Sequence, residues 1–252
     1  MMSRNDLKGK VVLIAGGAKN LGGLLSLDFA KKGAKVVIHY NSDSTKEDAE
    51  KTLSEIHAIG AEAILIQGDL TVPANVTKLF EEAIAKFGGI DIAINTVGMV
   101  LKKPFSETTE AEYDVMFGVN SKSAYFFLQE AGKKINDNGK ICTIVTSLLA
   151  AYTGLYSTYA GAKAPVEHFT RAASKEFGER GISVTAVAPG PMDTPFFYGQ
   201  ESSDAVAYHK SASALGGLTD IRDIAPLVEF LVTDGWWITG QTIFANGGYT
   251  TR

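Results

Sequence analysis

Short β-branched, apolar runs alternate with longer helical patterns along almost the whole chain, and this alternation constrains the fold more than any other feature. Most of the runs are apolar throughout, which is typical of strands covered on both faces. Strand and helix taking turns predict βαβ units with right-handed crossovers. The expected strands are 11–15, 35–40, 63–67, 90–95, 140–145, 182–188 and 241–245, and the expected helices are 21–32, 44–59, 72–87, 110–136, 157–180 and 221–233. We therefore predict one doubly wound (Rossmann) α/β domain over residues 1–252, built on a seven-stranded parallel sheet with helices on both faces.

The bulk composition argues against several classes of function. A net charge of -4 leaves no basic footprint for nucleic acid, and no run of apolar residues is long enough to span a membrane. The N-terminal stretch MMSRNDLKGK lacks the apolar middle of a signal peptide. Cys142, the single cysteine, lies in an apolar run and is read as a small buried hydrophobe, and the histidines show no metal-ligand spacing. We expect a cytoplasmic protein with no metal, nucleic acid or membrane partner.

The one long irregular segment covers residues 190–220, called the cap segment below. It is too long for a plain connection, and long segments over the edge of a scaffold are often substrate lids. An ordinary excursion that carries its own short helix is the alternative.

A glycine-rich loop, LIAGGAKNLGG, joins the first expected strand to the first helix. Gly16, Gly17 and Gly22 allow a tight turn and let backbone amides approach a pyrophosphate at the helix N-terminus. Asn20 stands where most loops of this kind place another glycine. Asparagine tolerates positive φ better than other non-glycine residues, so a phosphate-binding loop is still expected.

The end of the second strand indicates which nucleotide the loop holds. An NAD site usually places a carboxylate there, but this strand ends in Tyr40, followed by Asn41 and Ser42. Lys19, inside the glycine loop, could meet a 2′-phosphate, although a solvated loop lysine is the alternative. Asp43 is expected to cap the next helix. The pattern favours NADP(H) over NAD(H).

Tyr159 and Lys163 carry the expected chemistry. They are four residues apart, so on a helix they share one face. A free tyrosine has a pKa of about 10, and a neighbouring ammonium would lower it. Ser147, just past an expected strand, lies at the carboxyl edge of the sheet, where its hydroxyl could steady a substrate oxygen. A Tyr-xxx-Lys pair by itself is more often structural.

These features occur together in an order that resembles the short-chain dehydrogenase/reductase superfamily in its short, single-domain form. AGGAKNLG resembles the TGxxxGxG loop, GDLT holds the acidic residue of the adenine site, and NTVG resembles the NNAG element. PGPMDT matches the PGxxxT segment, and TGQTIFANGG resembles the late strand, with Asn246 in place of the usual Asp. The cofactor contacts that the resemblance and the loop imply are Gly16, Lys19, Asn20, Leu21, Gly22, Tyr40, Asn41, Ser42, Asp69, Leu70, Asn95, Gly98, Tyr159, Lys163, Pro189, Gly190, Met192 and Thr194.

The resemblance also implies a catalytic set of Asn120, Ser147, Tyr159 and Lys163. Tyr159 would donate a proton to a carbonyl that receives hydride from NADPH, and Ser147 would hold the carbonyl oxygen. Lys163 would bind the nicotinamide ribose and lower the pKa of Tyr159, while Asn120 would anchor a water. The gap from Ser147 to Tyr159 is one residue shorter than in many members, and a second hydroxyl residue, Thr146, precedes Ser147. Ser147 is still preferred, since it should emerge facing the carboxyl edge of the sheet.

The substrate is less constrained than the reaction. An apolar rim is expected, and it suggests a ketone or an acyl chain, although such residues also pack in ordinary loops. The expected rim residues, besides Met192, are Tyr152, Leu155, Tyr156, Phe196, Phe197 and Tyr198. The sequence most resembles 3-oxoacyl-thioester reductases and general ketone reductases.

The resemblance leaves alternatives open. A carrier-protein reductase usually has a basic pair at its entrance, of which Arg180 matches one member while Asn138 occupies the other position. A sugar or polyol dehydrogenase, and a non-catalytic NADP-binding redox sensor, are the other candidates. An epimerase or dehydratase of the extended branch would need a larger C-terminal domain. By resemblance a homotetramer, or a homodimer, is expected.

Overall fold

The computed structural model of the chain describes residues 6–251, so half of the polar N-terminal stretch considered above lies outside the described residues. Seven parallel strands form one sheet in the order β3-β2-β1-β4-β5-β6-β7. Their bounds are Val11–Ala15 (β1), Lys35–Tyr40 (β2), Ala63–Gln67 (β3), Ile92–Asn95 (β4), Lys140–Ile144 (β5), Ser183–Pro189 (β6) and Thr242–Ala245 (β7). The predicted doubly wound α/β fold is therefore confirmed, with strand ends that differ by at most two residues.

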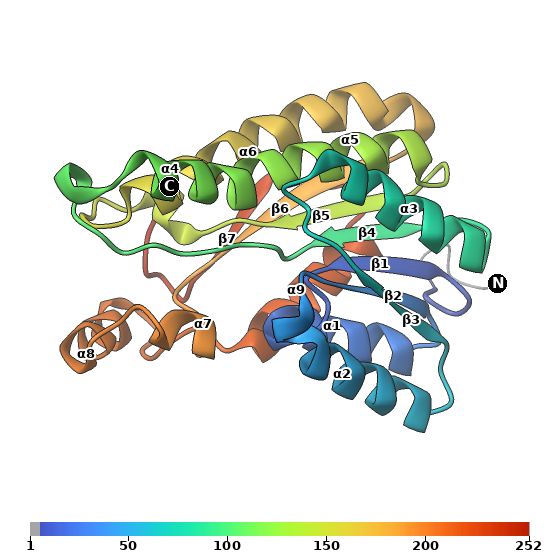
Figure 1. Cartoon of the computed structure of the whole chain (residues 1–252), viewed down its shortest axis with the longest axis horizontal. Coiled ribbons are helices and arrows are strands. Elements are labelled where there is room, and N and C mark those ends of the chain that lie inside the picture. The colour runs from blue at the N-terminus through green and yellow to red at the C-terminus, as the bar shows by residue number, and fades with distance from the viewer. Residues whose placement is uncertain (1–5, 252) are drawn as a thin grey trace.

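Helices cover both faces of the sheet (Figure 1). One layer holds α1, α2 and α9, and the other holds α3, α5 and α6. The bounds of the first layer are Asn20–Lys31 (α1), Lys46–Ala58 (α2) and Ile221–Val232 (α9). Those of the second are Pro73–Phe87 (α3), Ser123–Lys134 (α5) and Ser157–Phe177 (α6), with Glu110–Phe117 (α4) preceding α5.

The alternating side chains of β1 show how the two layers are held. Ile14 packs into the cluster that contains Phe29 of α1, whereas Leu13 packs into the cluster that contains Phe80 of α3 and Phe127 of α5. All five side chains are at most 1% exposed. Because successive side chains of a strand point to opposite faces, one apolar run serves both cores. Cys142 on β5 is also fully buried, as expected.

The long helix expected over 110–136 is interrupted. After α4 the chain forms one π-helical segment, Gly118–Lys122, before it continues as α5. Such π-bulges occur mostly inside α-helices and frequently at functional sites. This one contains Asn120, whose side chain leaves the helix to bind a neighbouring loop. Periodicity could not reveal an insertion that shifts the register by one residue.

The cap segment, residues 190–220, carries two short helices, Pro195–Tyr198 (α7) and Ser203–Ala212 (α8). They lie beyond the end of the sheet at which the glycine loop is found (Figure 1). A bridge between Met192 and Thr219 closes the segment at its base. No helix in the described part of the chain has the length and apolar character that a membrane crossing would need.

Candidate active site

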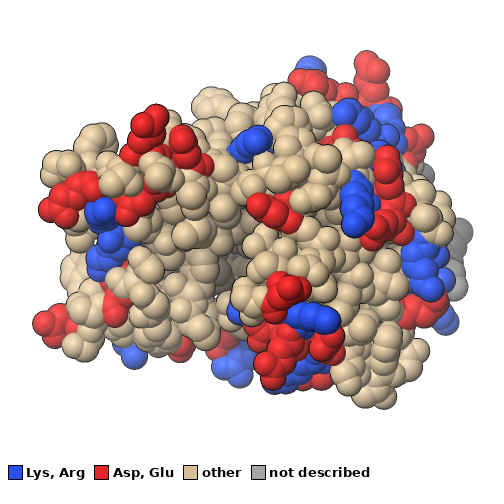
Figure 2. Space-filling view, in the orientation of Figure 1, with Lys and Arg blue, Asp and Glu red and all other residues tan. Residues whose placement is uncertain are grey.

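The cleft of the molecule opens where the strand order reverses, between β1 and β4. Open α/β sheets bind ligands at the carboxyl ends of their strands at this point. A cavity of about 1160 Å³ lies there, between the glycine loop and the cap segment. Figure 2 shows the hollow between the two layers, with charged side chains of both signs around it. It is large enough for a cofactor-sized ligand.

The glycine loop forms the floor of this cleft under the N-terminus of α1. Asn20 has a φ of 50°, so the asparagine does occupy the left-handed region as predicted. A Cβ at Gly22 would lie 2.1 Å from the backbone oxygen of Gly16, and a Cβ at Gly16 would lie 2.6 Å from Oγ1 of Thr96. The loop therefore requires glycine at both positions, and its amides are left close to the cavity.

His39 fixes the position of this loop. Its Nδ1 accepts a hydrogen bond from the backbone N–H of Gly16 at 3.1 Å, and its Nε2 bonds the carbonyl of Gly68 at 2.7 Å. Only a neutral imidazole protonated on Nε2 can make both bonds. Burial lowers the pKa of His39 to about 4, so the ring stays neutral at physiological pH.

The rim at the end of β2 carries one ion pair and the carboxylate of Asp43. Nζ of Lys19 lies 2.7 Å from the Asp48 carboxylate. Tyr40 donates its hydroxyl hydrogen bond to Gln67 at 3.3 Å. Asp43 does not cap α2 as we expected: it accepts a hydrogen bond from Gln67, and Ser42 caps the short turn before the helix. The Gln67 amide at the end of β3 donates a hydrogen bond to the Asp43 carboxylate, and this contact takes the place of a contact with the start of α2.

Tyr159 and Lys163 both lie on α6 and line the cleft. Nζ of Lys163 donates hydrogen bonds of 3.0 Å to the carbonyls of Val97 and Ile144. Burial lowers its pKa to about 8. Burial raises the pKa of Tyr159 to about 12, and the contact that opposes this rise is a hydrogen bond from Thr146. The expected lowering of the tyrosine pKa by Lys163 is thus not found, because desolvation outweighs any charge effect.

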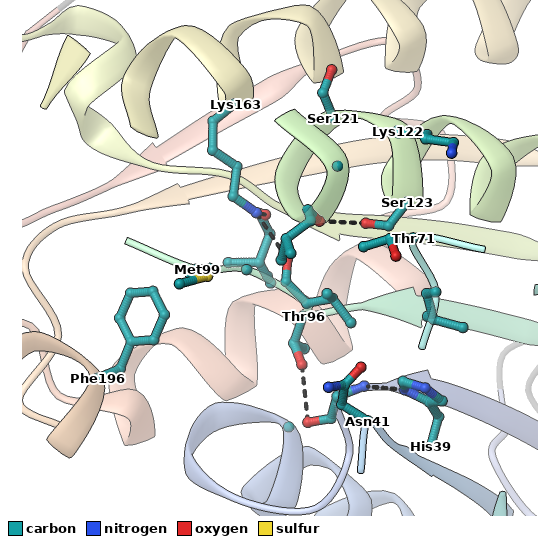
Figure 3. A pocket seen from close by; sticks show the side chains of 18 of the residues that line it. His39, Asn41, Thr71, Thr96, Met99, Ser121, Lys122, Ser123, Lys163 and Phe196 are labelled. Carbon is teal, nitrogen blue, oxygen red and sulfur yellow. Dashed lines mark hydrogen bonds between the residues drawn. The ribbon is translucent and has the colours of Figure 1, made fainter. Parts of the chain in front are cut away.

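Asn120 connects the π-segment to the loop after β4. Its Nδ2 donates to the carbonyls of Met99 (2.8 Å) and Met116 (3.0 Å), and its Oδ1 accepts from the N–H of Met99 (3.1 Å). A Cβ at Gly98 would lie 3.3 Å from this Oδ1 and 3.2 Å from Nζ of Lys163. The missing side chain at Gly98 therefore keeps the amide and the ammonium next to each other. In Figure 3 Lys163 reaches down from α6 into this region, while Phe196 faces Met99 across the cavity.

Two adjacent hydroxyls lie at the end of β5, and they have different partners. Thr146, 8% exposed, accepts a hydrogen bond from the N–H of Leu148 at 3.2 Å and bonds the Tyr159 phenol. Ser147, 2% exposed, donates to the carbonyl of Ala188 at 2.9 Å and accepts from Nδ2 of Asn246 at 3.0 Å. Both residues line the smaller pocket together with Tyr159, and Thr146 is the one whose contact lowers the pKa of the phenol.

A second, smaller pocket adjoins the cleft, and Tyr159 lines both. Its far wall contains Glu201, a carboxylate whose side chain is only 1% exposed. Lys102 forms an ion pair with Glu201, and the Tyr156 hydroxyl donates to it. His209, whose Nδ1 bonds the Tyr249 hydroxyl at 2.8 Å, lies 3.7 Å from the same carboxylate. These contacts tie the cap segment to the floor of the site.

The predicted residues divide by position. Those that line the large cleft are Gly16, Lys19, Asn20, Leu21, Gly22, Tyr40, Asn41, Asp69, Leu70, Gly98, Tyr159, Lys163, Met192 and Thr194. Those that line the smaller pocket alone are Ser147, Tyr156, Pro189, Gly190 and Phe197, while Tyr159, Met192, Thr194 and Phe196 line both. Asn120 lines neither pocket, and the same holds for five further named residues: Ser42, Asn95, Tyr152, Leu155 and Tyr198.

These five have other surroundings. Asn95 is buried and its Oδ1 accepts from the N–H of Val97, which shapes the loop from below. Tyr198 bonds Asp193 on the outside of the cap segment, and Tyr152 is fully exposed. The expectation that the aromatic residues near the cap segment line the substrate pocket was therefore only partly correct.

Sequence reasoning missed the polar groups of the smaller pocket. Glu201 and His209 lie on the irregular segment, and Lys102 lies about a hundred residues earlier. None of the three belongs to a spacing pattern, so no signal in the chain would have brought them together. His39 was also missed as a support of the glycine loop, although its place on a buried strand was a hint that its ring needs partners.

Comparison with known proteins shows which family the chain belongs to. Residues 16–250 match a family model described as Enoyl-(Acyl carrier protein) reductase. A hydroxynaphthalene reductase-like protein of Metarhizium brunneum is 35% identical, over 98% of this chain and 97% of its own. A dehydrogenase of Burkholderia cenocepacia, solved with bound NADP, is 64% identical with a TM-score of 0.97, over 100% of this chain and 97% of its own. A blue fluorescent protein from a metagenomic library, solved with NADPH, is 30% identical with a TM-score of 0.91, over 98% and 100% of the two chains.

The chain therefore belongs to the short-chain dehydrogenase/reductase family, and it is an NAD(P)-dependent oxidoreductase.

Proposed function

We propose that the protein reduces a ketone carbonyl to a secondary alcohol with NADPH, reversibly, and that Tyr159 is the general acid. One observation carries this proposal: the half-buried Tyr159 lies in the wall shared by the large cleft and the smaller pocket. With a pKa of about 12 it holds its proton at neutral pH, as a proton donor in reduction must.

The large cleft suits NADP(H). Glycine is required at Gly16 and Gly22, which leaves backbone amides for a pyrophosphate at the start of α1. Tyr40 and Asn41, and not a carboxylate, line the cleft at the end of β2, and Lys19 lines the same cleft, which favours a 2′-phosphate. The Burkholderia relative holds NADP. When bound, NADPH supplies the hydride that the protein itself lacks.

The remaining residues hold the proton and the cofactor in place. Lys163, with a pKa near 8, donates to two carbonyls and has a third N–H for a ribose hydroxyl. Asn120 holds the Met99 backbone beside it. A hydroxyl at the end of β5 steadies the carbonyl oxygen as negative charge develops on it.

The smaller pocket favours a substrate with a flat apolar body. Phe196, Phe197 and Tyr156 contribute its aromatic lining, and Glu201 makes one end polar. A hydroxylated aromatic ketone fits this description, and one relative is named a hydroxynaphthalene reductase-like protein. A 3-oxoacyl thioester and a sugar or polyol are the alternatives. The description of the family model adds enoyl thioesters to the compounds to be tested.

The test is NADPH oxidation, followed by absorbance, with a panel of these carbonyl compounds. We expect turnover of at least one ketone, and Tyr159→Phe should lose at least ~100-fold in turnover while keeping its affinity for NADPH. Near-native turnover in that variant would remove Tyr159 from its role. Cofactor binding without oxidation by any compound would instead favour an NADP-binding redox sensor. The cytoplasmic location and the homotetramer stay predictions, the latter testable by light scattering.

A further inference from the structure

The geometry points to a division of labour between the adjacent hydroxyls at the end of β5: Thr146 holds the substrate oxygen, and Ser147 is a positioning residue that anchors the loop to the C-terminal segment. This inference rests on the proposed ketone reduction and names the hydroxyl that the reaction uses. It differs from the family resemblance, which pointed to Ser147.

The hydrogen of Ser147 is already in use. A serine hydroxyl has one hydrogen to donate, and Ser147 gives it to the carbonyl of Ala188 at 2.9 Å. Nδ2 of Asn246 occupies the acceptor side of the same oxygen at 3.0 Å. To donate to a substrate, Ser147 would have to leave a carbonyl without its partner at a site where its own side chain is 2% exposed.

The hydrogen of Thr146 points the other way. Oγ1 of Thr146 accepts the backbone N–H of Leu148, so one lone pair is filled and the hydroxyl hydrogen is directed elsewhere. Among the described residues this hydrogen has no carbonyl or carboxylate acceptor, and Thr146 lies close enough to the Tyr159 phenol to lower its pKa against the effect of burial. Thr146 and Tyr159 both line the smaller pocket. A carbonyl oxygen placed between them would receive two hydrogen bonds.

The spacing of the chain agrees with this geometry. The gap from Ser147 to Tyr159 is one residue shorter than in many members of the family, and counting from Thr146 adds that residue. Thr146 is extended, with φ −152° and ψ 145°, and a 3-10 turn begins at Ser147. Both residues line the smaller pocket, but the hydroxyl of Ser147 donates to the Ala188 carbonyl on β6.

The contacts of Asn246 give the Ser147 hydroxyl a structural role. Its Nδ2 also bonds the Thr250 side chain at 2.8 Å, and its Oδ1 accepts the N–H of Gly248 at 3.0 Å. The amide thus joins the segment after β7 to the end of β5 through Ser147. An aspartate at this position would only accept hydrogen bonds and would draw the hydrogen of Ser147 away from Ala188.

In the reaction, two electrons and a hydrogen reach the carbonyl carbon as hydride from NADPH, which leaves as NADP⁺. The carbonyl π bond breaks, and its oxygen takes the Tyr159 proton as the O–H bond forms. Thr146 keeps its own proton throughout and donates a hydrogen bond to the oxygen while charge develops there. Losing one such donor typically costs about 10²–10³ in turnover.

The experiment compares Thr146→Val with Ser147→Ala, using the ketone that the wild-type enzyme reduces fastest. Thr146→Val should lose about 100-fold in kcat, and its affinity for NADPH, measured by fluorescence, should stay within about 2-fold of wild type. Thr146→Ser should restore most of the rate, because it keeps the hydroxyl. Ser147→Ala should keep kcat within about 10-fold but lower the Tm by about 2–8 °C, since two buried polar groups lose a partner.

The pH profile of alcohol oxidation separates a catalytic from a structural role. Tyr159 is the base in that direction, so its pKa sets the acid limb of kcat. Thr146→Val should move this limb to higher pH, because the contact that lowers the pKa is gone. Ser147→Ala should leave the limb in place.

The outcomes decide between the two hydroxyls. A loss of kcat in Ser147→Ala that equals or exceeds the loss in Thr146→Val would overturn the proposal, as would near-native kcat in Thr146→Val. A crystal structure with NADP⁺ gives a reading that needs no turnover: Ser147 within hydrogen-bond distance of Tyr159 in place of Thr146 would also refute it. Failure of the wild type on every ketone would count against the proposed function, while the crystal structure still decides the assignment.

Discussion

Replacing Lys163 with methionine should change how the stability of the cofactor-free protein depends on pH. The lysine is 3% exposed, and burial lowers its pKa from 10.5 to about 8. Between these two values the unfolded chain binds more protons than the folded one, so wild-type stability rises with pH in that window. At about 1.36 kcal/mol per pKa unit, the cost of burying the ammonium is about 3 kcal/mol below pH 8 and disappears above pH 10.5.

The assay is urea unfolding of both proteins at pH 7 and pH 9.5, followed by tryptophan fluorescence. The stability of Lys163→Met relative to wild type should fall by about 2 kcal/mol between the two pH values, because the wild type alone recovers the burial cost. Loss of the hydrogen bonds to Val97 and Ile144 affects both measurements and cancels. The exposed Lys51→Met is the matched control and should show no such trend. A constant difference for Lys163→Met would refute the argument.

Three further predictions concern the rest of the site. Gly22→Ala should abolish NADPH binding and destabilise the fold by at least about 2 kcal/mol, because its Cβ would meet a backbone oxygen at 2.1 Å; Gly23→Ala, whose nearest contact is 3.2 Å, should be much milder in thermal melts. Lys19→Ala should weaken NADPH about 10-fold and leave NADH unchanged in fluorescence titrations, and equal losses would exclude a contact with the 2′-phosphate. Glu201→Gln breaks the ion pair to Lys102, so limited proteolysis between residues 195 and 215 should become several-fold faster; an unchanged rate would mean that the pair does not hold the cap segment.

The fold could be predicted because its determinants are local. Most strands of this sheet are largely apolar runs, since helices cover both faces of the sheet, and helices of ordinary length separate the runs. The position of Asn20 in the left-handed region followed from the same kind of reasoning, because few residues other than glycine adopt it readily. The π-segment at Gly118–Lys122 did not, because its cause is a hydrogen bond from Asn120 to a loop that is distant in sequence.

The candidate site was predictable as a set of residue types and positions, and less so as a set of contacts. Ser147 and Thr146 are both hydroxyls at one strand end, and only the folded structure shows that the Ser147 hydroxyl is bonded to Ala188 while Thr146 acts on Tyr159. The polar end of the smaller pocket joins Lys102 to Glu201 across 99 residues, by an ion pair for which neither segment carries a pattern. Contacts of this kind depend on the final packing of the chain and leave no periodic trace.

The pKa values of Tyr159 and Lys163 show why their spacing alone does not establish how the phenol transfers its proton. Four residues separate Tyr159 from Lys163 on a helix, and this spacing suggests that the ammonium acidifies the phenol. Burial acts on both groups at once and in opposite directions: it raises the pKa of the tyrosine to about 12 and lowers that of the lysine to about 8. In this state the phenol is a proton donor, and its hydrogen-bond partner is the neighbouring threonine. Lowering of the phenol pKa would therefore have to come from charge that arrives with the cofactor, and the acid limb of alcohol oxidation should lie at lower pH than the pKa of the free enzyme implies.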